Sequence, residues 1–498
     1  ENAMSLAEMK IEKFNICRHN PAAAEIEVRF FPKDTVYSPR VAIVFSCGKE
    51  NRGLPMKTFL DGDSIVSIGT YDSNDIFLKK PDSEIKVSFV FSNGIDNGVR
   101  FDTDLTMPRH KRNPLKYYLS CTKREKEKIA VSVLFNIVST PFRMLKIKKN
   151  RISFFTNRDD EPKGNLKAVY ETVKDIEGAD IHLVCCSGGA KGTLKVLPKF
   201  MWLYMTSRIV YVDDYYHLIS YVKKKTGTTL IQLWHGCGAF KTAGYSRIHK
   251  KSRLEVNSRN HRQYDLAIVS SPDVTEIYAE VFGISDYKVL PLGSPRCDAL
   301  VDEEHLAKTR EKIYEKYPNL KDKKVLLFAP TFRGKGNGNC YYPTEKFNVD
   351  KVLSILGDEW VIAIKLHPYL HEKFTCSDEN AHRMIDCSSE DINDVLPVTS
   401  FLVTDYSSVI FEASILRIPM AFFVFDLEKF IKNRDFHHDF KAFIPGPMAR
   451  TDEEIAKIVK EGKIDQSVIE EFRKKNFGDT LGHACENIKS LTKNLMNE

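Results

Sequence analysis

The chain of 498 residues is too long for a single hydrophobic core and predicts about three domains. Its 42% hydrophobic and 28% charged residues are ordinary for a soluble globular protein, and no run of about 18 apolar residues predicts a membrane-spanning helix. The net charge of +7 is concentrated in residues 109–149, where twelve Lys or Arg stand against two Glu, so the basic character is local.

Residues 5–105 are β-rich. Runs of branched and aromatic residues at 27–31, 41–45 and 85–91 are separated by turn clusters at 61–63 and 92–94. We expect a small β-sandwich that serves as an accessory or binding domain. The eleven cysteines of the whole chain are scattered without a CxxC pair, which indicates reduced thiols in a cytoplasmic protein and not a zinc site.

Residues 106–149 form a basic amphipathic connector. The apolar run 129–138 follows the charged run 123–128, and residues 141–149 again mix lysines with apolar side chains. Two structures fit this pattern equally well: a segment lying on an anionic membrane surface, and a helix packed between two domains with a solvated charged face. No nucleic-acid partner is expected, because no nucleic-acid motif accompanies the charge.

From residue 150 onward the pattern alternates between strands and helices, which predicts two parallel α/β domains. We assign residues 150–292 to an N-terminal Rossmann-like domain and residues 293–498 to a C-terminal one, joined at the hinge 291–295. A helix is expected over residues 165–173. The predicted strands are 151–155, 181–185, 209–212, 229–234 and 266–269 in the first domain, and 324–328, 360–364, 401–403 and 420–423 in the second. Facing domains of this kind bind ligands in the cleft at the carboxyl ends of the strands.

Four polar motifs each follow one of these strands. They are Trp234-His235-Gly236-Cys237-Gly238, Ala329-Pro330-Thr331-Phe332-Arg333-Gly334, Lys365-Leu366-His367-Pro368 and Thr404-Asp405-Tyr406-Ser407-Ser408. A lone histidine after a strand is more often structural than catalytic, but four such motifs around one cleft favour function. Two imidazoles, an arginine and a helix N-terminus suit the activation of a hydroxyl and the transfer of a phosphoryl group.

The last of these motifs predicts a phosphate site. A buried strand ends at Thr404, and a helix begins after Ser408. The free backbone N–H groups and the positive end of the helix dipole would meet an anion there. The alternative is that Asp405 or Ser407 is an ordinary N-cap.

The ordered motifs, with Gly293-Ser294-Pro295-Arg296-Cys297-Asp298 among them, resemble the CDP-glycerol glycerophosphotransferase family, the teichoic-acid primases and polymerases of bacterial walls and related capsule enzymes. The resemblance covers about residues 150–480. It implies a GT-B architecture, so the expected fold class is α/β, with two facing doubly wound Rossmann-like domains preceded by a small β-rich domain. It also implies peripheral attachment to the cytoplasmic face of the cell membrane, with residues 109–149 meeting the anionic surface.

The resemblance implies that glycerol phosphate passes from CDP-glycerol to the terminal hydroxyl of a membrane-linked acceptor, with release of CMP. His235 would be the general base, and His367 would hydrogen-bond the phosphoryl group. The implied donor-binding residues are Arg333, Thr331, Thr404, Asp405, Ser407, Ser408 and Lys365, with Gly236, Arg296 and Asp298 as further candidates. No cofactor is expected, and the need for a divalent metal stays open. His437-His438 beside Asp435 and Asp439 are taken as a polar loop over the cleft, with a metal cluster as the less favoured alternative.

One departure from the family pattern concerns the acceptor. Many members have Thr-Pro after Trp-His-Gly, where this chain has Cys237-Gly238. The alternatives are a CDP-ribitol-dependent transferase, a nucleotide-sugar glycosyltransferase of the same fold, and a non-catalytic membrane-bound scaffold that binds polymer. Retention of both His235 and His367 argues against the scaffold.

Overall fold

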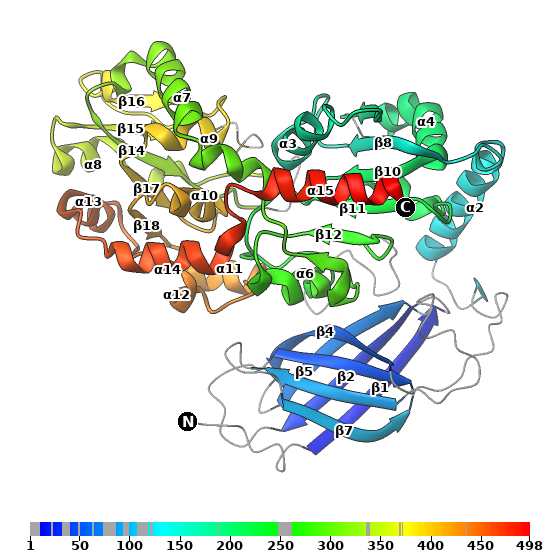
Figure 1. The fold of residues 1–498 in the computed structure, drawn as a ribbon. Coiled ribbons are helices and arrows are strands. Elements are labelled where there is room, and N and C mark those ends of the chain that lie inside the picture. Colours follow the sequence, from blue (N-terminus) through cyan, green and yellow to red (C-terminus); the bar gives the residue numbers. More distant parts are fainter. Residues whose placement is uncertain are drawn as a thin grey trace.

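In the computed structural model, the chain forms a β-sheet domain followed by two α/β domains that lie side by side (Figure 1). The structure describes residues 10–498 except 21–22, 32–39, 48–49, 62–63, 73–85, 93–98, 107–117, 120–122, 188, 248–260, 335–338, 368–369, 371 and 435. The two turn clusters expected in the first domain lie partly outside these residues, and residues 109–117 of the basic stretch lie wholly outside them.

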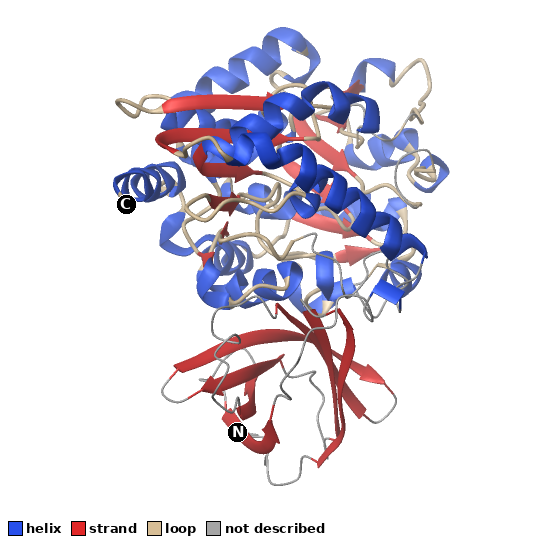
Figure 2. Cartoon of the chain, turned by 90° about the vertical axis from the view of Figure 1, so that its right-hand side faces the viewer, coloured by secondary structure: helices blue, strands red, loops and turns tan. Residues whose placement is uncertain are grey.

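The N-terminal domain is an antiparallel sheet of seven strands, which Figure 2 shows below the α/β domains. In spatial order the strands are β1 (Lys10–Asn20), β2 (Ala23–Phe31), β5 (Ser64–Asp72), β4 (Glu50–Asp61), β3 (Arg40–Cys47), β6 (Lys86–Ser92) and β7 (Val99–Thr106). Val41, Ile43 and Phe45 of β3 are buried while the residues between them are partly exposed, which is the alternation of a strand with one covered face.

The connector contains helix α2 (Lys123–Arg143), which docks on the first α/β domain. Ser132 Oγ and Asn136 Nδ2 both donate to the carbonyl of Tyr221 at 2.8 Å. The other side of α2 is open, and Leu134 and Ile137 are 59% and 64% exposed. Among the residues that the structure describes, no helix combines the length and the apolar character needed to cross a membrane.

The first α/β domain has a parallel sheet buried on both faces, as expected for strands such as Phe154-Phe155 and Ile209-Val210. Its spatial order is β13 (Val289–Leu290), β12 (Leu266–Ile268), β11 (Thr229–Gln232), β10 (Ser207–Val212), β8 (Lys148–Thr156) and β9 (Asp180–Cys185). Its helices are α3 (Gly164–Val173), α4 (Gly189–Thr206), α5 (His217–Tyr221) and α6 (Thr275–Phe282).

The second α/β domain repeats this plan with a second parallel sheet. Its order is β16 (Met384–Asp386), β15 (Trp360–Ile364), β14 (Lys324–Ala329), β17 (Phe401–Thr404), β18 (Met420–Phe423) and β19 (Met448–Ala449). Its helices are α7 (Glu303–Lys316), α8 (Val349–Leu356), α9 (Ile392–Val395), α10 (Val409–Ile415), α11 (Leu427–Asn433), α12 (Phe440–Phe443), α13 (Asp452–Glu461) and α14 (Gln466–Phe477). Each predicted strand of both domains overlaps an observed one, and the short strands β13, β16 and β19 were not expected.

The last helix, α15 (Ala484–Asn497), returns to the first α/β domain (Figure 1). Ile488 is fully buried in the core of that domain, and Thr492 Oγ1 lies 2.7 Å from the hydroxyl of Tyr211. The segment 293–498 is therefore not one spatial unit, because the apolar face of α15 is covered by the first sheet and not by the second.

Candidate active site

Three neighbouring strands of the first sheet end in charged or titratable residues. Arg158 follows β8, Asp213 and Asp214 follow β10, and His235 follows β11. These strands are parallel and adjacent in the order β8, β10, β11. Their carboxyl ends meet at one edge of the sheet, so a cation, two carboxylates and an imidazole gather there.

Trp234 turns the chain sharply between β11 and His235. Its φ of 54° lies in the left-handed region, which costs a non-glycine residue about 1–3 kcal/mol and is typical of functional sites. The turn is held by Gln232 Oε1, which accepts from the Trp234 N–H at 2.7 Å, and by Asn165 Nδ2, which donates to the Trp234 carbonyl at 3.1 Å. This strain fixes the direction in which His235 leaves the sheet.

His235 lies between a carboxylate and two cations. Its Nδ1 is 3.6 Å from Asp214 Oδ2, which is also 3.6 Å from Arg158 Nε. Burial lowers the pKa of His235 well below its usual range, Asp214 opposes this shift, and Arg158 and Arg296 reinforce it. The ring is therefore neutral at pH 7, as a general base must be. Burial also raises the pKa of Asp213 to about 6.

His367 follows β15 in the second domain, and its ring forms a T-shaped pair with the ring of Phe332 at a centroid distance of 4.8 Å. Partial burial and surrounding positive charge lower the pKa of His367 to about 4. The cations responsible are Lys241, Lys365, Arg158 and Arg434. Arg158 contributes to the lowered pKa of both His235 and His367, which is the reason to treat the two strand ends as one candidate site.

The segment after His235 crosses to the second domain. Gly238 has a φ of +56°, and a Cβ atom there would lie 2.3 Å from the ring of Phe411 in α10. Two residues later the carbonyl of Phe240 accepts from the His437 N–H at 2.8 Å, and Lys241 forms an isolated antiparallel bridge with Phe436. The absence of a side chain at Gly238 is what lets the His235 loop press against the helix of the opposite domain.

This crossing brings together three cations without carboxylate partners: Lys241, Arg247 and Arg434. No carboxylate of the described residues lies within 4.0 Å of their side chains, and Nε of both arginines is buried without a hydrogen bond. Burial and the charge of Arg434 lower the pKa of Lys241 to about 7. Burial lowers the pKa of Arg247 and of Arg434 as well. A bound anion would supply the missing negative charge.

The contacts of Arg333 differ from those expected of a donor-binding residue. Its Nη1 donates to Asp405 at 2.8 Å, while Nε and Nη2 donate to Asp426 at 2.7 and 2.9 Å. The N–H of Thr331 donates to Asp405 at 2.8 Å, and the buried hydroxyl of Thr404 donates to a main-chain carbonyl of β14 at 2.7 Å. The guanidinium is already neutralised by two carboxylates, so Arg333, Asp405 and Thr404 link the ends of β14 and β17 and do not lie open to a ligand. The Thr331 hydroxyl, in contrast, is buried without a hydrogen-bond partner.

The other expected site residues fall into two groups. Ser407 and Ser408 are half-buried at the start of α10, and the Ser408 side chain makes no capping bond. Lys365 Nζ faces the same junction and donates to a main-chain carbonyl after β16 at 3.0 Å. Asp298, in contrast, accepts from the first two amides of α15 at 3.2 and 2.7 Å, so it caps a helix. Gly236 has a negative φ and room for a side chain, so its backbone does not require glycine.

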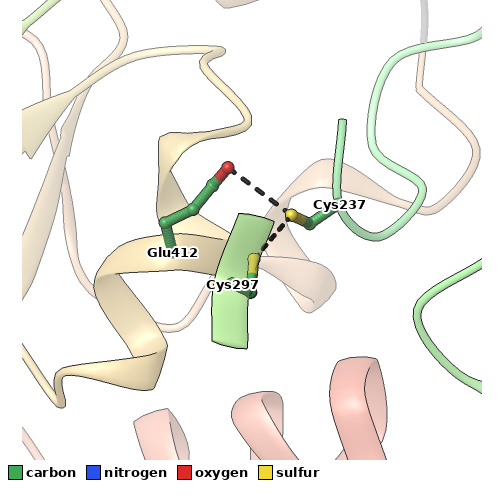
Figure 3. A group of neighbouring side chains, drawn as sticks. All are labelled: Cys237, Cys297 and Glu412. Atoms are coloured by element: carbon green, nitrogen blue, oxygen red, sulfur yellow. Dashed lines mark hydrogen bonds between the residues drawn. The ribbon is translucent and has the colours of Figure 1, made fainter. Parts of the chain in front are cut away.

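Arg296 contacts a buried group of three side chains. Figure 3 shows this group, which consists of Cys237, Cys297 and Glu412. It pairs with Glu412, and Cys237 Sγ lies 3.1 Å from Cys297 Sγ and 3.5 Å from Glu412 Oε1. Two sulfur ligands of one tetrahedral zinc ion would be about 3.8 Å apart, given Zn–S bonds of about 2.3 Å. Arg296 already balances the Glu412 charge, so the group fits a hydrogen-bonded seam between the domains better than a metal centre.

The pair His437-His438, considered above as a possible metal cluster, lies among residues with structural contacts. The ring of His438 stacks on Phe443 at 4.3 Å, and Asp439 caps α12 by accepting from the Ala442 N–H at 3.0 Å. Asp435 lies outside the described residues.

A family model described as CDP-Glycerol:Poly(glycerophosphate) glycerophosphotransferase matches residues 137–489, well over half of the chain. The chain belongs to this family. It is 39% identical over 358 residues to a teichoic acid poly(ribitol-phosphate) polymerase of Bacillus spizizenii, a match that covers 71% of this chain and 58% of that protein. It is 33% identical over 400 residues to the ribitol-phosphate polymerase TarK of Staphylococcus aureus, covering 78% of each. A glycerol-phosphate primase of Bacillus subtilis is 28% identical over 304 residues, covering 60% of this chain and 77% of the primase.

The solved structure of the wall teichoic acid polymerase TagF, in a variant described as H548A, has a similar fold. Its TM-score is 0.60 at 23% identity, and the match covers 75% of this chain and 95% of the TagF chain. The two parallel-sheet, Rossmann-like domains of this family member thus have the TagF-like arrangement.

Sequence reasoning missed Arg158, Asp214, Lys241, Arg247 and Arg434. The first two follow predicted strands, so the criterion that selected His235 and His367 would also have selected them. Lys241 and Arg434 carry no such signal, because they meet only through the crossing of the loop after His235.

The buried network around Arg333 yields a stability prediction. Arg333→Met leaves Asp405 and Asp426 without their cation, and we expect a loss of about 3–5 kcal/mol in the free energy of unfolding. Urea unfolding followed by circular dichroism measures it. The exposed pair of Arg417 with Glu470 provides the control, since Arg417→Met should cost less than about 1 kcal/mol. Unchanged stability together with a raised KM for the donor would restore the donor-binding role of Arg333.

Proposed function

We propose that this protein transfers a polyol phosphate from a CDP-activated polyol to the terminal hydroxyl of a membrane-linked polyol-phosphate acceptor and releases CMP. The observation that carries the proposal is the cluster of cations Lys241, Arg247 and Arg434, for which the described residues offer no carboxylate partner; Lys241 and Arg434 also act on His367. A pyrophosphate has the charge that this cluster lacks. Membership of the glycerophosphotransferase family supports the same reaction class.

The chemistry follows from the positions of the two imidazoles. Neutral His235 accepts the proton of the acceptor hydroxyl, whose oxygen attacks the phosphorus that bears the polyol. The bond from that phosphorus to the CMP oxygen breaks, and negative charge moves onto the leaving group. His367 hydrogen-bonds the phosphoryl group, and Lys241 and Arg434 offset the charge on the leaving group. The amides at the start of α10, with Ser407 and Ser408, remain predicted contacts of the pyrophosphate.

The identity of the polyol is part of the proposal. The relative at 39% identity is a ribitol-phosphate polymerase, whereas the glycerol-phosphate primase is 28% identical. These values favour CDP-ribitol as the donor. CDP-glycerol, the donor implied by the family motifs, is the second candidate.

An assay of CMP release tests both the reaction and the donor. Purified protein is incubated with CDP-ribitol, CDP-glycerol or a UDP-sugar, with an acceptor carrying a short polyol-phosphate chain. We expect CMP from a CDP-polyol, and a drop in kcat of about 10²–10⁴-fold in His235→Ala. His305→Ala, at an exposed position of α7, is the matched control and should keep the wild-type rate. Full activity of a folded His235→Ala protein would exclude the proposed base, and transfer only from a UDP-sugar would exclude the reaction.

Lys241 gives a second prediction, in the pH dependence of donor use. A lysine with a pKa of about 7 binds an anion while it is protonated, so KM for the donor should rise as pH increases above 7. Lys241→Met should raise KM about 10–150-fold, the equivalent of 1.5–3 kcal/mol for a charge-assisted hydrogen bond, and should flatten the profile. Lys241→Arg should keep the affinity and lose only the rise. Lys351→Met, at an exposed ion pair, is the control. A KM of Lys241→Met equal to wild type at pH 6 would place the donor elsewhere.

We further propose that α2 holds the protein at an anionic membrane surface. Val133, Leu134 and Ile137 are exposed on a helix whose first residues, Lys123 to Lys128, are rich in lysine. Such a face would keep the enzyme near a lipid-linked acceptor.

Vesicle flotation tests the membrane contact. The protein should float with phosphatidylglycerol-containing vesicles and not with phosphatidylcholine alone, because apolar insertion and charge act together. Replacement of Val133, Leu134 and Ile137 by Ser should abolish flotation. The same replacement at three other exposed apolar residues, Val301, Met448 and Val468, should leave it unchanged. Equal flotation of both triple variants would mean that α2 is not the contact.

A further inference from the structure

We propose that Asp214 is a positioning residue, which holds the His235 ring in the tautomer that leaves Nε2 free to accept a proton. This inference rests on the proposed function, because it assigns a role within that reaction. It concerns a carboxylate that neither the strand-end motifs nor the family resemblance singled out.

The geometry comes from neighbouring strands. β10 and β11 are paired in parallel, with Val212 opposite Gln232, so the residues that follow them leave the sheet side by side. Asp214 Oδ2 lies 3.6 Å from His235 Nδ1, and no other carboxylate of the described residues lies within 4.0 Å of that ring. Nδ1 is buried and makes no hydrogen bond. A shift of less than about 1 Å would bring the two atoms to hydrogen-bond distance, and catalytic hydrogen bonds commonly tighten when substrate binds.

The direction of the Asp214 side chain is itself fixed. Asp214 Oδ1 accepts from the Tyr215 N–H at 2.7 Å, which turns Oδ2 toward His235. Gln232 Nε2 donates to the Asp214 carbonyl at 3.1 Å and ties the residue to β11. Arg158 Nε, 3.6 Å from Oδ2, places a positive charge on the side of the carboxylate next to His235.

Among the described residues, four groups act most strongly on the charge of His235. They are the carboxylate of Asp214, the guanidinium groups of Arg158 and Arg296, and the backbone of Asp213. The Asp213 side chain is engaged elsewhere, by Thr156 and at 4.0 Å by Arg158, and its raised pKa makes it a weaker ionic partner. The two candidate acceptors for the Nδ1 proton are thus the Asp214 carboxylate and the Asp213 carbonyl, and an experiment can separate them.

The chemical consequence is specific. A proton on Nδ1 leaves the lone pair on Nε2, which takes the hydroxyl proton as the new oxygen–phosphorus bond forms and the bond to CMP breaks. The resulting imidazolium carries a full positive charge beside two arginines, and Asp214 supplies the compensating charge. Without Asp214 the imidazolium would form less readily, because both arginines oppose protonation of the ring.

The kinetic test compares wild type with Asp214→Asn and Asp214→Glu, using the CDP-polyol that gives CMP. We expect kcat of Asp214→Asn to fall by about 10²-fold or more, with KM for the donor changed less than about threefold. Removal of the Asp214 charge lowers the pKa of His235 further, so the acidic limb of the kcat profile should move to lower pH. Asp214→Glu should recover at least a tenth of the wild-type kcat, since it restores the carboxylate.

Asp180 provides a matched control. It forms another carboxylate–histidine pair in the same sheet, at 2.8 Å from His182 Nε2, but it lies at the amino end of β9. Asp180→Asn removes the same charge without reaching the junction, so kcat and the pH profile should stay at wild-type values.

A second readout does not depend on turnover. In protein labelled with ¹⁵N in its histidine rings, the His235 signals, assigned by comparison with His235→Asn, should report the Nδ1–H tautomer in wild type and a changed tautomer or pKa in Asp214→Asn. An unchanged tautomer and an unchanged pH profile in Asp214→Asn would overturn the proposal in favour of the Asp213 carbonyl. If wild type releases no CMP from any CDP-polyol, the proposed function fails, while the ring signals still decide the role of Asp214.

Discussion

The contact between Gly238 and the Phe411 ring is the constraint on which the site depends. It lets the segment that carries His235 lie directly against α10, with the buried group of Arg296, Cys237 and Glu412 beside it. From there the chain reaches the second domain and pairs Lys241 with Phe436. Without this crossing, each sheet would still end in polar residues, but the polar residues of the two sheets would not form one site.

Charge balance separates the structural cations from those available to a ligand. Arg333 is buried, but Asp405 and Asp426 neutralise it, so the fold accounts for its presence. Lys241, Arg247 and Arg434 are also sheltered, yet the described residues offer them no carboxylate. Burying charge without a partner is unfavourable, and folded proteins retain such an arrangement where a ligand completes it.

The two imidazoles differ in what surrounds them. His235 has Asp214 and the strained Trp234 behind it, which fix a ring that must accept a proton. His367 has an aromatic ring on one side, and the described groups that lower its pKa are cations, which suits a group that contacts phosphate oxygens. The proposed base and the proposed phosphoryl contact thus differ in their neighbours, although both residues are histidines that follow a parallel strand.

The sequence by itself determined the two parallel sheets and the placement of His235 and His367 after their strands. Strand-forming runs and the polar residues that end them are local features, and the spacing of apolar residues along the chain reveals them. Only the tertiary structure decided that Arg333 is neutralised, that α15 belongs to the first domain, and that Lys241 meets Arg434. These facts depend on contacts between residues far apart in the chain, which no local pattern encodes.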